Sequence, residues 1–191
     1  MSATLTDETL IQQAQAGRQS AFSILVKRYE QYVYTLALRF VKNREDADEV
    51  AQDCFLRMFR YLPDFRGEAK FSTWLYRIVY STSMNFLRKQ RPEILSLDDD
   101  ERPVRLGDHS APDASAGLER QDLNASLQRA IDQLLPDDAG IITLFYMYDH
   151  NLEEICEIME ITMSNAKTKL CRARQRLKLI VEHKFADQIG I

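Results

Sequence analysis

The sequence lacks the residue patterns that catalysis or a metal site would need. Among its 191 residues are three cysteines and three histidines. No cysteine pair has CxxC spacing, no histidine belongs to an HExxH pattern, and no nucleophile stands beside a base. We therefore expect no catalytic residue, no metal and no cofactor, with buried free thiols at Cys54, Cys156 and Cys171. The last two fall on neighbouring predicted helices, which leaves a redox or zinc role open.

Long apolar runs are also missing. No stretch of about 18 apolar residues occurs, and no basic start is followed by an apolar segment. We therefore expect no membrane insertion, no signal peptide and a cytoplasmic protein.

Glycine and proline are scarce, with six and five in the whole chain. Pro92, Pro103 and Pro112 fall in the segment 92–117, together with the acidic run 98–101. This composition predicts a flexible acidic linker. Apolar residues recur at helical spacing on both sides of it. The sequence thus predicts an all-α protein, with two small helical domains at 1–91 and 118–191.

Charge is strongly segregated along the chain. The formal net charge of -4 does not by itself favour a nucleic-acid partner. Acids crowd into 45–53, 93–113 and 153–160, however, while bases crowd into 66–91 and 167–178. Local fields rather than the total charge decide which partners bind.

The stretch 151–181 reads as two helices separated by a tight turn. Asn151 can cap the first helix, with Glu154 reaching back to it, and Thr162 can cap the second. The second helix combines a basic surface with an apolar stripe, which makes DNA phosphate the obvious partner. A solvated face, a membrane-surface helix and a partner helix remain alternatives. The stripe consists of Ala166, Leu170, Ala173, Leu177 and Ile180, and the bases are Lys167, Lys169, Arg172, Arg174, Arg176 and Lys178.

The first part of the chain predicts three helices, at about 7–16, 20–41 and 45–60. The first turns of the third helix are acidic, and acidic side chains stabilise a helix N-terminus. One interpretation is therefore a well-capped helix with a solvated face. Its predicted inward residues are Val50, Ala51, Cys54, Phe55, Met58 and Phe59.

A loop at 64–70 leads into a predicted helix at 71–90, whose outer faces mix aromatic, hydroxyl and basic side chains. Exposed rings can stack on splayed bases while Arg and Lys hold the backbone, so this mixture suits single-stranded DNA. The competing reading is core packing, which we expect for Phe71, Trp74 and Phe86. We expect Thr73, Tyr76, Arg77, Tyr80, Ser81 and Arg88 to lie off the buried face.

Two further helices are predicted at 118–135 and 138–148, and the second should cover the helix-turn-helix. The inward residues expected in them are Leu123, Leu127, Ala130, Ile131, Leu134, Ile141, Ile142, Leu144, Phe145 and Met147.

Three stretches together resemble one family, the extracytoplasmic-function (group 4) sigma factors of bacteria. They are the acidic signature from Glu45 to Phe55, the segment Phe71–Ile78 followed by Asn85, and the helix-turn-helix from Leu152 to Arg174. The resemblance implies a transcription initiation factor that binds core RNA polymerase and promoter DNA. It also implies an anti-sigma protein as a further partner.

The resemblance assigns candidate residues to three surfaces. Polymerase would contact Asp48, Glu49, Gln52 and Asp53. The -10 element would be melted and recognised by Phe65, Arg66, Lys70, Thr73, Tyr76, Arg77, Tyr80, Ser81, Asn85 and Arg88. The -35 element would be read by Ser164, Asn165, Lys167, Thr168, Lys169, Arg172 and Arg174.

The sequence departs from the family pattern at three places. Glu160 stands where the family usually has a turn glycine, Ser164-Asn165 replaces a Gly-Thr pair, and Tyr80-Ser81 replaces Arg-Asn or Val-Asn. Two other functions stay open at this point. A helix-turn-helix regulator would bind duplex DNA without polymerase, and a helical adaptor would bind protein alone.

Overall fold

The computed structural model describes residues 5–90 and 119–189, with side chains for 5–90 and 125–183. The predicted linker 92–117 lies outside these ranges. Helices and turns make up the described elements, which contain no strand. They are α1 (Asp7–Gln15), α2 (Gln19–Val41), α3 (Arg44–Tyr61), η1 (Leu62–Asp64), α4 (Phe71–Gln90), α5 (Glu119–Asp132), α6 (Pro136–Ile142), η3 (Thr143–Met147), α7 (Leu152–Met159) and α8 (Met163–Ile189).

Side-chain caps fix several helix starts, of which the Asn43 cap was not predicted from the sequence. Thr6 accepts a hydrogen bond from the Thr9 amide, and Asn43 caps α3 through the Asp46 amide. Asn151 and Glu154 form a complete capping box on α7. Each of these caps satisfies a backbone N–H that the helix itself cannot.

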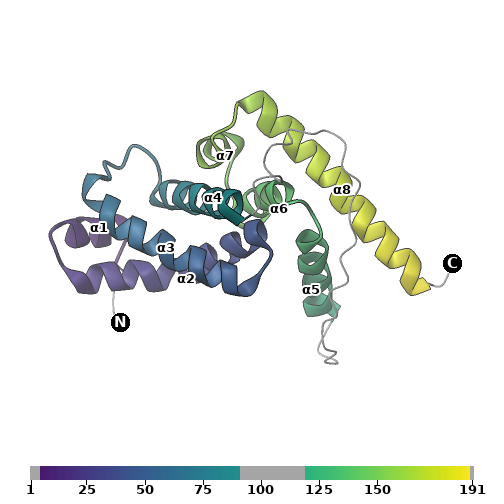
Figure 1. Ribbon diagram of the computed structural model, residues 1–191, viewed down its shortest axis with the longest axis horizontal. Helices are drawn as coiled ribbons and strands as arrows, with labels where there is room; N and C mark the ends of the chain where they lie inside the picture. Colours follow the sequence, from purple (N-terminus) through teal and green to yellow (C-terminus); the bar gives the residue numbers. More distant parts are fainter. Residues whose placement is uncertain (1–4, 91–118, 190–191) are drawn as a thin grey trace.

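The helices form two groups that lie side by side (Figure 1). The N-terminal helix group comprises α1–α4, and the C-terminal helix group comprises α5–α8. Within the second group, α6 lies between α4 and α8, while the short α7 lies beside α4 (Figure 1). Contacts of α2 with α6 and of α4 with α7 join the two groups. None of the helices in the described ranges combines the length and apolar character needed to cross a membrane.

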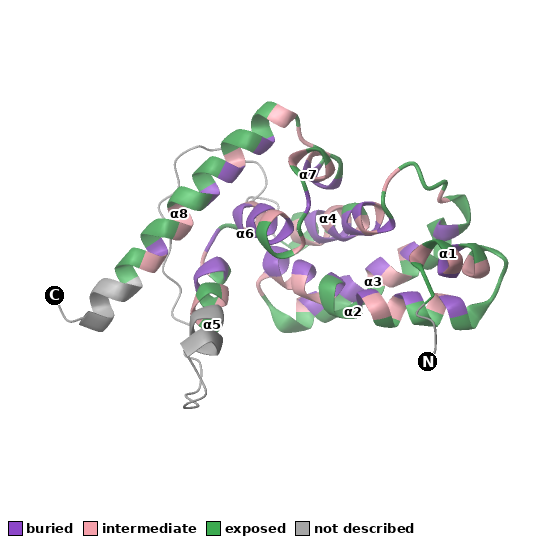
Figure 2. Cartoon of the chain, turned by 180° about the vertical axis from the view of Figure 1, so that it is seen from behind, coloured by how far each residue is buried: buried purple, intermediate pink, exposed green. Residues whose placement is uncertain are grey.

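One hydrophobic cluster runs through both helix groups. Figure 2 shows its buried residues gathered where α2, α4 and α6 meet. Gly140 of α6 lies against the Phe40 ring, and a Cβ at Gly140 would be only 2.4 Å from that ring. Glycine is thus the residue that permits α6 to approach α2 this closely.

Three residues predicted to face inward are exposed instead. Phe59 is 61% exposed, Leu127 40% and Met147 39%. Each belongs to an amphipathic stripe, and the contact on Phe59 is an edge-on one, with the Phe22 ring of α2 at 5.1 Å. The single helix predicted at 138–148 is divided in the structure, because α6 is followed by a π-helix at Thr143–Met147.

Candidate nucleic-acid interface

The acidic face of α3 is open to solvent. Asp48, Glu49 and Gln52 are exposed, while Asp53 is half-buried and accepts a hydrogen bond from Arg57 at 2.9 Å. Phe59 and Leu56, the latter 66% exposed, continue the same helix. An acidic surface bordered by exposed apolar side chains suits a protein partner that has both basic and apolar groups.

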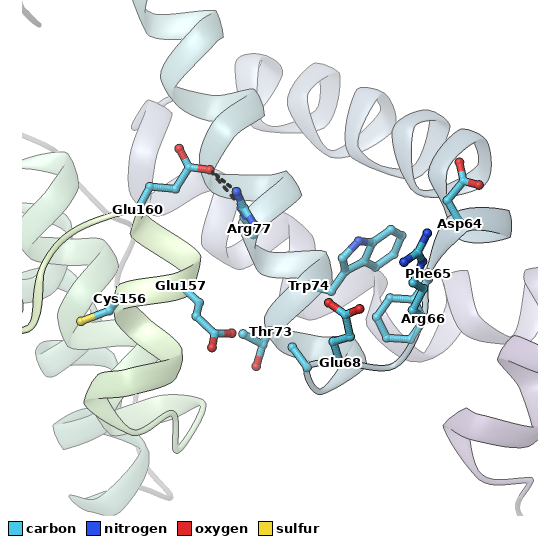
Figure 3. A pocket seen from close by; sticks show the side chains of 11 residues that line it. Asp64, Phe65, Arg66, Glu68, Thr73, Trp74, Arg77, Cys156, Glu157 and Glu160 are labelled. Atoms are coloured by element: carbon cyan, nitrogen blue, oxygen red, sulfur yellow. Dashed lines mark hydrogen bonds and ion pairs between the residues drawn. The ribbon is translucent and has the colours of Figure 1, made fainter.

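A pocket of about 790 Å³ lies between the loop 64–70, α4 and α7. Phe65, half-buried, packs its ring 5.0 Å from Trp74 and 5.7 Å from Phe71. Figure 3 shows Arg66 and Glu68 beside these rings, and Glu157 of α7 pointing toward Thr73 of α4. Rings on one wall and exposed cations at the rim are a suitable arrangement for an unstacked base. The lining residues are Asp64, Phe65, Arg66, Glu68, Ala69, Thr73, Trp74, Arg77, Cys156, Glu157 and Glu160.

Two predicted DNA-binding cations are paired with acids of the C-terminal helix group. Lys70 Nζ lies 2.6 Å from Glu154 Oε1, and Arg77 Nη2 lies 2.9 Å from Glu160 Oε1 (Figure 3 shows the second pair). The Glu154 carboxylate raises the pKa of Lys70 by accepting its hydrogen bond. Burial alone would raise the pKa of Glu154, but hydrogen bonds from Lys70, Asn151 and His150 lower it overall. Both cations are therefore ion-paired within the chain.

Tyr76, Thr73 and Tyr80 are less accessible than the sequence analysis expects. Tyr76 is 3% and Thr73 2% exposed, and Tyr80 is half-buried with its ring 5.4 Å from Phe40. Burial raises the pKa of the Tyr76 and Tyr80 hydroxyls. The expectation of open rings is wrong because α4 is covered on two sides, by the N-terminal helix group and by α7.

The C-terminal helix group directly covers Tyr76. The ring of Tyr148 lies 5.3 Å from the Tyr76 ring at 30°, and His150 approaches the same ring edge-on at 5.3 Å. The Tyr148 hydroxyl also donates to the backbone oxygen of Tyr32 at 3.0 Å. Tyr148 therefore covers Tyr76 in a tilted ring contact.

The remaining predicted residues of α4 lie toward its C-terminal half. Ser81, half-buried, donates its hydroxyl to the Ile78 carbonyl of its own helix at 3.1 Å. Asn85 and Arg88 are exposed, and Arg88 donates to the Asn85 side chain at 3.2 Å. Arg66 is exposed as well. These exposed groups are placed where a nucleic-acid backbone could reach them.

The basic surface of α8 is largely as predicted, because its apolar stripe packs inward. Thr162 caps the helix by accepting from the Asn165 amide at 3.3 Å. The exposed predicted residues are Ser164, Asn165, Lys167, Thr168, Arg172 and Arg174. A helix whose first turns carry hydroxyl, amide and basic groups is suited to enter a major groove.

Lys169 does not belong to this open surface. Its ammonium group forms an ion pair with Asp137 at 2.8 Å, and its side chain is 23% exposed. The expectation of a free basic group is wrong here, since Asp137 in the first turn of α6 faces α8. Arg176 is likewise held by the buried Asp138 at 2.5 Å. These two pairs fasten α8 to α6.

The sequence analysis missed several residues that build the pocket. Trp74, expected in the core, is half-buried and lines the pocket, and Glu157 and Glu160 close it from the other helix group. Glu160 has φ 56° and ψ 41°, a left-handed conformation that favours glycine. Because the family pattern has glycine at this position, the acid at Glu160 was the signal that could have identified this residue as part of the site.

The cysteines form no disulfide. Cys54 is buried, and burial raises its pKa to about 12. Cys156 is half-buried beside the pocket, and Cys171 is exposed on α8. Within the described ranges, no group of three or more His, Cys, Asp or Glu residues could hold a metal ion.

Family models and curated relatives match most of the chain. Sigma-70 region 2 matches residues 25–93, and Sigma-70, region 4 matches residues 124–177. The ECF RNA polymerase sigma-E factor of Haemophilus influenzae is 35% identical over 189 residues, covering 93% of this chain and 96% of that protein. The sigma-E factor of Escherichia coli K12 is 33% identical, covering 93% and 95%. The RNA polymerase sigma-H factor of Pseudomonas aeruginosa is 31% identical, covering 90% and 91%.

Solved structures agree on the fold. The complex of CnrH with the cytosolic domain of CnrY matches with a TM-score of 0.64 at 22% identity, covering 93% of this chain and 97% of that chain. The sigma factor RpoE from Bartonella quintana matches with a TM-score of 0.63 at 19% identity, covering 84% and 96%.

The chain belongs to the sigma-70 family of RNA polymerase sigma factors, in its extracytoplasmic-function group. It is a promoter-specific initiation factor of RNA polymerase, from a family not known for enzymatic activity. The predicted family and the all-α fold are thus confirmed.

Proposed function

We propose that the N-terminal helix group docks on core RNA polymerase through the acidic face of α3. The observation that carries this assignment is the exposure of Asp48, Glu49 and Gln52 on one helix, next to the exposed Phe59. Carboxylates in this setting steer association with a basic partner and fix its register. In this function the protein acts in the cytoplasm, where polymerase and promoter are found.

The same helix group recognises the -10 element as a single strand. The pocket between the loop 64–70 and α4 receives an unstacked base against Phe65 and Trp74. Stacking on an aromatic ring contributes roughly 1–3 kcal/mol per base. This compares with the few kcal/mol needed to extrude a base from the duplex. Lys70, Arg77 and Arg88 would then hold the phosphates.

The C-terminal helix group reads the -35 element as a duplex. The N-terminal part of α8 enters the major groove, so Ser164, Asn165, Lys167 and Thr168 face base edges and phosphates. Residues 92–117 connect the two sites. An anti-sigma protein is a further expected partner, because the similar RpoE of Bartonella quintana was solved with the anti-sigma factor NepR.

Run-off transcription with core polymerase on a promoter library tests this function. We expect transcripts from a defined subset of sequences, and loss of those transcripts when the acidic face of α3 is reversed in charge. A regulator that acts without polymerase would protect duplex DNA alone and give no transcript in this assay.

Specificity can be tested separately in each half. Substitution of Phe65 by Ala should lower transcription from promoters that differ in the -10 element. It should leave the binding of duplex DNA that carries the -35 element unchanged. Substitution of Lys167 by Ala should weaken duplex binding and lower its salt dependence. Equal loss at both elements from either substitution would contradict the division of labour.

A further inference from the structure

We infer that Gln15 of α1 is a positioning residue of the single-strand site, because its side chain holds the loop 64–70 in the shape that places the Phe65 ring in the pocket. This inference rests on the proposed function in taking that pocket as the site of the unstacked base. The helix α1 contributes no residue to the three surfaces assigned from the family pattern. The Sigma-70 region 2 match begins at residue 25, so α1 also lies outside it.

Two hydrogen bonds from one amide group join the end of α1 to the loop. Gln15 Nε2 donates to the Leu62 carbonyl at 3.0 Å and to the Phe65 carbonyl at 2.9 Å. A side-chain amide nitrogen carries two N–H donors, which matches the two acceptors. The second acceptor belongs to the residue whose ring lines the pocket, so the contact acts on the backbone of Phe65 itself.

Both ends of this connection are packed in the N-terminal helix group. On the α1 side, Leu10 and Ile11 are buried. The first turn of α1 is fixed as well, because Asp7 accepts a hydrogen bond from the Tyr29 hydroxyl. On the loop side, the Leu62 side chain is buried. Gln15 therefore connects the loop to a helix whose own position is set by the core.

The shape of the loop depends on how it starts, because its backbone leaves the helical pattern there. Phe65 is extended directly after η1, with φ -68° and ψ 117°. Gly67 has φ 75° and open space around the place that a Cβ would take. Release of the Phe65 carbonyl would let this backbone rotate and carry the ring away from Trp74, which it approaches to 5.0 Å. The pocket would then lose part of its stacking wall.

Substitutions at Gln15 can remove the two donors or restore them. Gln15→Glu keeps the shape of the side chain but replaces the donors by a carboxylate, which repels both carbonyl oxygens. Gln15→Ala removes the contacts without adding a charge, and alanine suits a helix. Gln15→Lys restores donors, since an ammonium group carries three. Gln12→Glu and Gln12→Lys are the matched controls, because Gln12 is exposed on the same helix.

The experiment measures how the full chain, assembled with core polymerase, binds a fluorescein-labelled, short single-stranded DNA of random sequence. The signal of core polymerase alone is subtracted. We expect Gln15→Glu and Gln15→Ala to weaken strand binding about three- to tenfold, as when the fraction of molecules with a well-placed loop falls to about a third or a tenth. Gln15→Lys and both Gln12 variants should bind as wild type does. Binding of duplex DNA by α8 should not change.

A double-mutant cycle with Phe65→Ala separates positioning from a general loss of structure. If Gln15 acts through the Phe65 ring, Gln15→Glu should weaken strand binding in the wild type and have no further effect once that ring is absent. A merely structural residue would lower the affinity by the same factor in both backgrounds, and that outcome overturns the inference. Wild-type affinity in Gln15→Glu and Gln15→Ala, where Phe65→Ala does weaken binding, overturns it as well.

Hydrogen–deuterium exchange of the full chain without polymerase keeps the inference apart from the proposed function. Amides of residues 62–70 should exchange faster in Gln15→Glu than in the wild type or in Gln12→Glu. If exchange rises but neither Gln15→Glu nor Phe65→Ala alters strand binding, the proposed strand site is contradicted and only the anchoring of the loop is supported. If exchange is unchanged and Phe65→Ala alone weakens strand binding, the role of Gln15 is contradicted and the proposed function stands.

Discussion

Two binding surfaces of the N-terminal helix group differ in accessibility. The acidic face of α3 presents Asp48, Glu49 and Gln52 to solvent. The neighbouring face of α4 has Tyr76 buried under Tyr148 and its cations paired with acids of α7. The isolated chain thus offers one surface freely and keeps the other covered.

The comparison between covered and exposed parts of the N-terminal helix group can be tested first by replacing one buried and one exposed phenylalanine with alanine. Phe40 is fully buried, so Phe40→Ala should lower the free energy of unfolding by about 3–5 kcal/mol. Phe59 is 61% exposed, so Phe59→Ala should change it by less than about 0.5 kcal/mol. Urea denaturation followed by circular dichroism measures both. Phe59→Ala should instead weaken polymerase binding, and equal destabilisation by the two substitutions would place Phe59 in the core.

Reversing charge on the open surface should have the next largest effect. Asp48→Lys with Glu49→Lys should reduce affinity for core polymerase roughly tenfold or more, because like charges then face a basic partner. Fluorescence anisotropy with labelled protein measures the loss. The matched control is Glu8→Lys with Glu30→Lys, which reverses two exposed acids on α1 and α2. An equal loss in the control would show that net charge, rather than the α3 face, determines binding.

The covered surface should be sensitive to pH through His150. Burial lowers the pKa of this imidazole below its ordinary value of 6.5, against the opposing effect of its hydrogen bond to the Glu154 carboxylate. The groups that face it are Glu154, Lys70, Asp149 and Tyr76. A lowered pKa means that the unfolded or open chain binds the proton more readily, so stability is full above about pH 6.5 and falls as the pH drops below it.

Thermal melting between about pH 7.5 and pH 5.5 tests this linkage. The melting temperature of the wild type should fall over that range, while His150→Gln should show a flatter profile. An equally steep profile in His150→Gln would assign the pH dependence to other groups.

The smallest effect concerns the turn between α7 and α8. Glu160→Gly relieves the left-handed backbone strain, which costs roughly 1–2 kcal/mol for a residue with a Cβ. Part of this gain is offset by the entropy of glycine, about 0.5–1 kcal/mol, and by loss of the Arg77 pair. We expect a net change within about 1 kcal/mol, toward higher stability, by urea denaturation. Clear destabilisation would mean that the Arg77 contact outweighs the strain.

Helix positions could be predicted from the sequence because their signals are local. Thr6, Asn43, Asn151 and Thr162 sit directly before apolar periodic segments, and three of the predicted helices differ from the observed ones by a residue or so. The prediction of the apolar stripe of α8 was correct for a similar reason. The helix packs with one face against the other helices of its group, α5, α6 and α7, so a single periodic pattern describes it.

The accessibility of α4 could not be predicted in this way. Helical periodicity identifies one buried face, but α4 contacts α2 and α3 on one side and α7 on the other. Tyr76 is buried by Tyr148 and His150 of the C-terminal helix group, and Tyr80 packs against Phe40 of α2. Lys169 was misjudged for a related reason, since Asp137 lies far from it in sequence and reaches it only in the folded chain.

The single tryptophan of the chain is Trp74, and its ring stands 5.0 Å from Phe65 within the pocket. Indole emission depends on polarity and on quenching by stacked bases, so the protein contains its own optical reporter. A nucleobase entering beside Phe65 should dim or shift this signal without any attached dye. Stopped-flow mixing could then time strand capture against polymerase docking in an unmodified protein.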